Sequence, residues 1–103
     1  MLEPSHRLLL LYDIHPDRFQ QYYLYMRGEF VPALQKMGLY MIFAWQVFGE
    51  GYPDRQVEFI CETPGVLRQA LLSEKFQHAE ERLKSYTTSY RRKVIPFENR
   101  YQF

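Results

Sequence analysis

The segment Leu39–Glu62, LYMIFAWQVFGEGYPDRQVEFICE, contains two runs rich in aromatic and branched residues. A stretch rich in glycine, proline and aspartate, Gly49–Asp54, separates them. Such runs on either side of a turn are typical of a β-hairpin with a longer loop. We therefore expect strands over Leu39–Phe48 and Gln56–Glu62, and we interpret the rest of the chain outward from them.

The two expected strands differ in the polarity of their faces. In the second, Val57, Phe59 and Cys61 alternate with polar residues, so one face of this strand meets solvent. In the first, both faces are apolar, with Leu39, Met41, Phe43, Trp45 and Val47 on one and Tyr40, Ile42, Ala44 and Phe48 on the other. A strand of this kind needs cover on both sides. We expect helices of the same chain on one side and a second copy of the chain on the other.

A strand and a helix precede this hairpin. Arg7–Ile14 is apolar at its centre, which predicts a strand that ends before Pro16. The helix begins at Pro16, because a missing N–H costs nothing in a first turn. Gly38 suits the position after the helix end, and Pro32 predicts a kink or break between Gly28 and Val31 because it removes a backbone donor.

A second helical region and a last strand follow the hairpin. Thr63 and Ser73 each suit the position before a helix, because their hydroxyls accept hydrogen bonds from N–H groups of the first turn. The expected buried line of the later helix is Phe76, Ala79, Leu83, Tyr86 and Tyr90. Arg91–Phe97 predicts an edge strand, which tolerates Pro96.

The resulting order of elements is β-α-β-β-α-β. It predicts an α+β fold of the ferredoxin-like type, a four-stranded antiparallel sheet with the helices on one face. The other sheet face would be bare and apolar, and a homodimer that packs two such sheets together would cover it. With 103 residues the chain suits a single domain, residues 1–103.

The composition and net charge indicate which partners and which cellular compartment to expect. Thirteen basic and twelve acidic residues give a formal net charge of +1, which offers no overall attraction for nucleic acid or an anionic membrane. The single cysteine, Cys61, suits a reducing cytoplasm, and the apolar run Leu8–Tyr12 is too short for a signal or membrane segment. We expect a cytoplasmic protein whose partners are a second copy of itself and a small molecule.

Several short segments resemble one superfamily. They are Val31–Gly38 (VPALQKMG), Phe43–Trp45 (FAW) with Gly49 beyond, Gln56–Val57, Leu71–Phe76 (LLSEKF) and Tyr90–Pro96 (YRRKVIP). Over Arg7–Phe97 the chain resembles the dimeric α+β barrel superfamily, and within it the NIPSNAP-like and stress-responsive barrel proteins. The resemblance implies a cleft between sheet and helices, which such proteins use for monooxygenation, haem breakdown or ligand binding.

The residues argue against haem breakdown and against a metal site. In this superfamily haem breakdown relies on an Asn on the first strand, a Trp ending the third strand and a His in the later helix. Here Arg7–Ile14 has no Asn, and Cys61 and Glu80 occupy the other two positions. The three histidines lack metal-ligand spacing, so we expect no metal and no cofactor.

The aromatic residues, 17% of the chain, are the remaining candidates for a site. If Phe48 pairs with Gln56, Trp45 lies opposite Phe59 on the same face. Rings from the first strand and first helix would complete a slot for a flat apolar molecule, with Asp13 orienting an imidazole. The predicted ligand-binding residues are Tyr12, His15, Tyr22, Trp45 and Phe59.

Three functions stay open on the sequence. The leading one is binding of a small apolar or aromatic compound in the sheet-helix cleft. The second is a cofactor-independent monooxygenase or isomerase on a phenolic or polyketide-like substrate, with His15 or a tyrosine moving the proton. The third is a structural interaction module whose aromatic residues serve only core and dimer. An open cleft with convergent polar groups would favour the first two, and a filled one the third.

Overall fold

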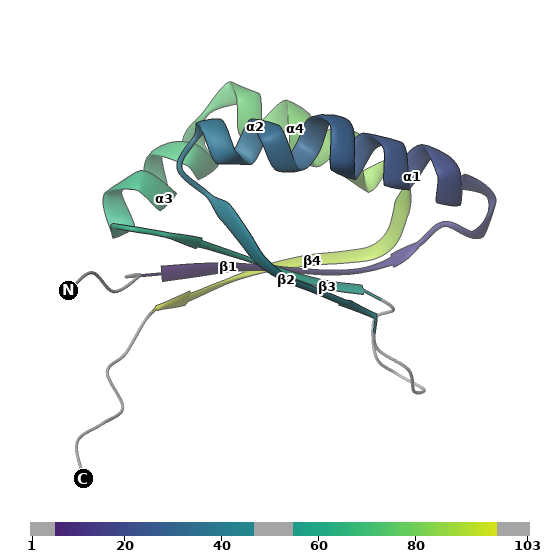
Figure 1. The fold of residues 1–103 in the computed structure, drawn as a ribbon, viewed down its shortest axis with the longest axis horizontal. Helices are drawn as coiled ribbons and strands as arrows, with labels where there is room; N and C mark the ends of the chain where they lie inside the picture. The colour runs from purple at the N-terminus through teal and green to yellow at the C-terminus, as the bar shows by residue number, and fades with distance from the viewer. Residues whose placement is uncertain (1–5, 47–54, 97–103) are drawn as a thin grey trace, which may run out of the picture.

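The structure, a computed structural model, describes residues 6–46 and 55–96, with Phe43 and Pro96 described by their backbone only. A four-stranded sheet carries the described helices on one of its faces (Figure 1). The strands are β1 (His6–Ile14), β2 (Tyr40–Gln46), β3 (Arg55–Cys61) and β4 (Thr87–Pro96). The helical elements are a 3₁₀ turn (Pro16–Arg18), α1 (Phe19–Tyr25), a π-helical turn (Met26–Phe30), α2 (Val31–Lys36), α3 (Pro64–Leu72) and α4 (Glu74–Lys84).

The strand order in the sheet is β2-β3-β1-β4, and each neighbouring pair is antiparallel. This is the ferredoxin-like topology, so the predicted α+β class and the predicted sheet with helices on one face are confirmed. The core lies between sheet and helices. Its largest fully buried side chains are Tyr12, Phe30, Phe59, Phe76, Leu8, Leu10, Leu34, Leu39, Leu83 and Val57.

The first helical run changes its hydrogen bonding where Pro32 was expected to disturb it. The backbone N–H of Val31 donates to the carbonyl of Met26, five residues back, which makes Met26–Phe30 a π-helical turn. Pro32 follows directly and has no N–H to donate. The helix absorbs the proline by this wider turn, and α1 and α2 form one continuous run (Figure 1).

The predicted helix boundaries at Thr63, Ser73 and Gly38 are confirmed. Thr63 Oγ1 accepts from the N–H of Val66, and Ser73 Oγ accepts from the N–H of Phe76, each at 3.1 Å. Gly38 follows the end of α2 with a φ of 90°, a conformation that L side chains rarely adopt. Thr63 and Ser73 thus mark the starts of α3 and α4, and Gly38 marks the end of α2.

The end of α4 was predicted wrongly. The helix ends at Lys84, and β4 begins at Thr87 rather than at Arg91, so Tyr90 lies on a strand and not on the helix. The spacing from Leu83 to Tyr90 fits a helix, but two consecutive β-branched threonines follow Tyr86 and favour a strand.

The predicted pairing of the hairpin was also wrong. Trp45 pairs with Gln56 and not with Phe59, a difference of three positions. Because three is odd, Trp45 lies on the sheet face away from the helices, whereas Phe59 lies on the helix face. The cause is a bulge at Ile42, without which Trp45 would oppose Arg55 and face the helices. Phe48 and the expected turn Gly49–Asp54 lie outside the described residues.

The face away from the helices, here called the outer sheet face, is partly apolar and exposed. Tyr40, Trp45 and Ile95 lie on it and are 49%, 50% and 41% exposed. The carboxylate of Glu58 pairs there with Arg7 at 2.8 Å. None of the described elements covers this face (Figure 1). The predicted grouping of the β2 side chains was wrong, because the bulge puts Tyr40 with Trp45 on this face and Met41 with Ala44 on the other. The homodimer stays a prediction.

Candidate functional site

Buried tyrosines meet where β1 ends and α1 begins. The hydroxyl oxygens of Tyr12 and Tyr22 lie 2.5 Å apart, and the two rings meet edge to face with centroids 5.7 Å apart. Tyr90 of β4 stacks on Tyr12 with a centroid distance of 6.1 Å. Tyr12 and Tyr22 are buried at 0% and 3% exposure. We call Tyr12, Tyr22 and Tyr90 the tyrosine cluster.

Arg55, the first residue of β3, borders the tyrosine cluster. It pairs with Tyr12 across the sheet, so the two side chains share the helix face. Its guanidinium lies 5.4 Å from the centre of the Tyr23 ring, and Nη2 donates to the Tyr23 hydroxyl. The Nε atom is buried and has no hydrogen-bond partner among the described residues. The guanidinium is thus held in place with one N–H lacking an acceptor.

A second donor in the tyrosine cluster also lacks an acceptor. Two hydroxyls that share one hydrogen bond use only one of their two hydrogens. In the described ranges the hydroxyls of Tyr12 and Tyr22 bond only to each other. Within the described residues, the interior next to α1 therefore holds one O–H and one N–H donor without an acceptor. Each buried donor left in this state costs about 1–3 kcal/mol.

The two tyrosines are neutral hydrogen-bond donors at neutral pH. Burial raises the pKa of Tyr12 well above the ordinary tyrosine value, and it also raises the pKa of Tyr22. Burial disfavours the charged phenolate, so both hydroxyls stay protonated. The chemistry that they offer is hydrogen-bond donation to an oxygen or to a negative charge.

A carboxylate fixes the third ring of the tyrosine cluster. The Tyr90 hydroxyl donates to Glu80 Oε2 at 2.7 Å, and Arg92 Nη1 pairs with the same oxygen at 3.1 Å. Burial, followed by the bond to Glu80, raises the pKa of Tyr90. Its hydroxyl is already committed, so Tyr90 offers a ring face rather than a free donor.

The structure brings together only part of the predicted site. Tyr12 and Tyr22 touch, and Phe59 lies deeper on the same side, with its ring 6.1 Å from that of Phe30. His15 Nδ1 accepts from the N–H of Asp17 at 3.2 Å and so caps the 3₁₀ turn. Trp45 lies on the outer sheet face, away from all of these residues.

Sequence reasoning missed Arg55 and placed Tyr90 on the wrong element. A signal for Arg55 was present, because it falls on the same alternating positions as Val57, Phe59 and Cys61. An arginine in line with three apolar residues of one strand indicates an inward guanidinium. Arg55 falls between the expected turn Gly49–Asp54 and the expected strand Gln56–Glu62 and so received no role.

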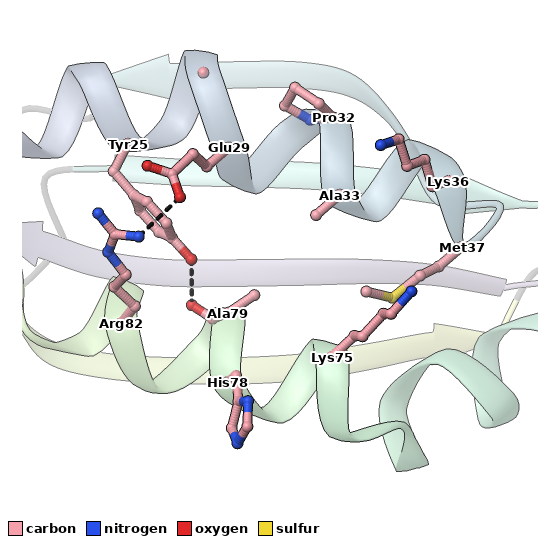
Figure 2. A pocket seen from close by; sticks show the side chains of 11 residues that line it. Tyr25, Glu29, Pro32, Ala33, Lys36, Met37, Lys75, His78, Ala79 and Arg82 are labelled. Carbon is pink, nitrogen blue, oxygen red and sulfur yellow. Dashed lines mark hydrogen bonds and ion pairs between the residues drawn. The ribbon is translucent and has the colours of Figure 1, made fainter.

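The space between the middle of the sheet and the helices is filled by side chains. Phe30, Phe59 and Phe76 are each fully buried there. An open groove of about 590 Å³ lies instead between the run α1–α2 and α4 (Figure 2). We call it the helix groove. In the described ranges no three His, Cys, Asp or Glu side chains gather as a metal site, and no helix is long and apolar enough to span a membrane.

Neither a family model nor a curated protein matches the sequence. Solved structures do match. A NIPSNAP family protein from Agrobacterium tumefaciens is 14% identical, with a TM-score of 0.61 over 94% of this chain and 95% of that one. A dimeric protein of unknown function and ferredoxin-like fold from Bacteroides fragilis is 11% identical, with a TM-score of 0.57 over 94% of this chain and 100% of that one. The chain has the fold of these proteins. SnoaB, a cofactor-independent oxygenase from Streptomyces nogalater, is 10% identical, with a TM-score of 0.64 over 98% of this chain and 100% of that one.

These likenesses confirm the predicted resemblance to the α+β barrel superfamily at the level of the fold. At identities of 10–14% they show the fold alone. What this protein binds has to be argued from its own residues.

Proposed function

We propose that this protein is a homodimer that binds a small, flat aromatic molecule between α1 and the sheet, at the tyrosine cluster. The observation that carries the proposal is a pair of donors, one tyrosine O–H and Arg55 Nε–H, that have no acceptor among residues 6–46 and 55–96. A carbonyl, enol or phenolate oxygen of a ligand would accept from both. Binding would then repay the cost of leaving these donors unpaired.

The surroundings of the two donors suit an aromatic ligand. Tyr12 and Tyr90 present ring faces, and the Phe19 and Tyr23 rings stack 6.4 Å apart at the solvent side of α1. Tyr23 is 42% exposed, so a ligand would enter past it by opening its hydrogen bond to Arg55. The guanidinium charge would favour a ligand with a partial or full negative charge.

Binding is favoured over catalysis because the tyrosine hydroxyls stay protonated. Tyr12 and Tyr22 have raised pKa values and would not accept a proton from a substrate at neutral pH. Catalysis by a cofactor-independent oxygenase or isomerase is the second candidate. The same O–H and N–H donors would stabilise the enolate of a phenolic or polyketide-like substrate, which supports that reading.

The homodimer is proposed through the outer sheet face. A stable interface buries about 1,200–2,000 Å² in total, and obligate interfaces are larger and more apolar. The exposed side chains of Tyr40, Trp45 and Ile95 supply apolar surface for such an interface. The dimeric protein from Bacteroides fragilis with this fold lends support.

The binding experiment is a titration with 1,8-dihydroxyanthraquinone, a flat phenol with carbonyl acceptors. We expect saturable binding to the wild type, and binding about tenfold weaker for Tyr22→Phe and for Arg55→Met. Arg55→Met removes the Nε–H donor, and Tyr22→Phe leaves the free O–H on Tyr12 alone, which is fully buried. Tyr40→Phe is the matched control, since it removes a hydroxyl on the outer sheet face and should bind like the wild type.

Equal affinity of Tyr22→Phe, Arg55→Met and the wild type would refute the site, and so would a complete lack of binding. Oxygen uptake measured with the same compound separates the two candidate functions. Steady consumption of oxygen that Tyr22→Phe abolishes would establish the enzyme, and binding without consumption supports the proposal as stated.

A further inference from the structure

At one end of the helix groove, a positive and a negative side chain neutralise each other. Arg82 Nη1 pairs there with Glu29 Oε1 at 2.8 Å, and its guanidinium lies 4.7 Å from the centre of the Tyr25 ring. The Tyr25 hydroxyl donates to the carbonyl of Ala79 at 2.7 Å, which ties α1 to α4 (Figure 2). A ligand finds no uncompensated charge at this end.

The opposite end of the helix groove carries two positive charges that the described residues do not neutralise. Lys36 is the last residue of α2, and Lys75 is the second residue of α4. Both side chains are exposed, and neither forms an ion pair within the described ranges. Met37 lines the groove beside them (Figure 2).

Between the two ends the lining is mostly apolar, with His78 of α4 as its polar side chain. Pro32, Ala33 and Ala79 line this part of the groove. The π-helical turn Met26–Phe30 brings Gly28 to the wall, and a Cβ built on Gly28 meets no atom within 4 Å. π-helical turns are frequent at functional sites, and this one contributes Gly28 to the lining of the groove.

We propose that the helix groove binds a single-chain anionic amphiphile, a site separate from the tyrosine cluster. The anionic head lies between Lys36 and Lys75, and the apolar chain runs along Ala33 and Ala79 toward Tyr25. Lys75 and Arg82 are seven positions apart on α4, which is about 10 Å of helix and fits a chain of roughly eight to ten carbons. Charge complementarity sets the direction, because within the described part of the chain Lys36 and Lys75 have no ion-pair partner, whereas Arg82 is paired with Glu29.

Decanoate is the probe, and methionine labelled with ¹³C in its methyl group is the readout. Met37 lines the groove, while Met26 is buried in the core and Met41 is on β2. We expect decanoate to shift the Met37 methyl signal saturably and to leave the other two unchanged. Acetate, which has the charge without the chain, and decyltrimethylammonium, which has the chain with the opposite charge, should not shift it.

Charge reversal tests the head-group end. The double variant Lys36→Glu/Lys75→Glu should bind decanoate at least about tenfold more weakly, because two attractive contacts become repulsive. Arg68→Glu, a single charge reversal on the exposed side of α3, is the control and should bind like the wild type. An unchanged Met26 signal confirms that each variant is folded.

Three results would overturn the proposal. They are equal binding of 1-decanol and decanoate, equal affinity of the lysine variant and Arg68→Glu, and a shift of Met41 without one of Met37. Tyr22→Phe should leave decanoate binding unchanged, so this site stands or falls independently of the tyrosine cluster.

Discussion

Replacing Gly38 by alanine should destabilise the fold by about 2–3 kcal/mol. Gly38 has a φ of 90°, and a Cβ built on it lies 2.8 Å from Cγ1 of Val66. A left-handed backbone costs an L residue about 1–2 kcal/mol. The contact adds about 0.5–1.5 kcal/mol, because Val66 is β-branched and can relieve it only by leaving its preferred rotamer or shifting α3.

The assay is urea unfolding at one fixed protein concentration, since self-association would stabilise the folded state by mass action. Gly28→Ala is the matched control, because Gly28 is helical and its new Cβ meets open space. Alanine in place of a helical glycine should stabilise the protein by about 0.5–1 kcal/mol. The two glycine variants are therefore expected to change stability in opposite directions.

A double-mutant cycle separates strain from contact. Val66→Ala removes Cγ1, so Gly38→Ala should cost about 0.5–1.5 kcal/mol less in the Val66→Ala background than in the wild type. A Gly38→Ala variant as stable as the wild type would refute the whole account. Strict additivity of the two changes would refute the contact with Val66 and leave only the backbone strain.

Two further predictions concern the outer sheet face and the pH dependence of stability. Trp45→Lys should convert a dimer into monomers of 12.6 kDa in light scattering at micromolar concentration, because it places a charge in the proposed interface; a wild type that is already a folded monomer would contradict the proposed dimer. Burial raises the pKa of Tyr25 to about 12 in the folded protein, whereas the same group in the unfolded chain ionises near pH 10. The stability that Tyr25 contributes below pH 10 should therefore fall as the pH rises from 10 through 12. Tyr25→Phe should lose less stability over that range in urea titrations at pH 9 and pH 11, and an equal loss in both proteins would contradict the raised pKa of Tyr25.

The sequence predicts the fold well because its local signals agree with each other. The hydroxyls of Thr63 and Ser73 cap α3 and α4, Gly38 follows α2, and apolar alternation in β3 points to the helix face. Each of these features is settled by a few neighbouring residues. Together they leave the ferredoxin-like order as the arrangement that satisfies all of them.

The candidate site was less predictable because it depends on register and on element ends. One bulge residue, Ile42, decides which face Trp45 occupies, and no local pattern marks it. Tyr90 follows Leu83 at a spacing that a helix also explains, so its stacking on Tyr12 required knowledge of where α4 ends. Tyr12 and Tyr22 were found because each lies on an apolar stripe whose period is unambiguous.

The bulge at Ile42 affects both faces of the sheet, because it decides on which face Trp45 lies. Without it Trp45 would oppose Arg55 on the helix face, and an indole would compete for the space beside the tyrosine cluster. With it, Gln46 opposes Arg55, and the indole adds apolar surface to the outer sheet face. The inward position of Arg55 comes from its pairing with Tyr12 of β1, and the odd shift of β2 keeps the indole out of the space beside it. The register of β2 against β3 therefore bears on both proposals, because it leaves the proposed ligand site clear and adds an aromatic ring to the proposed dimer surface.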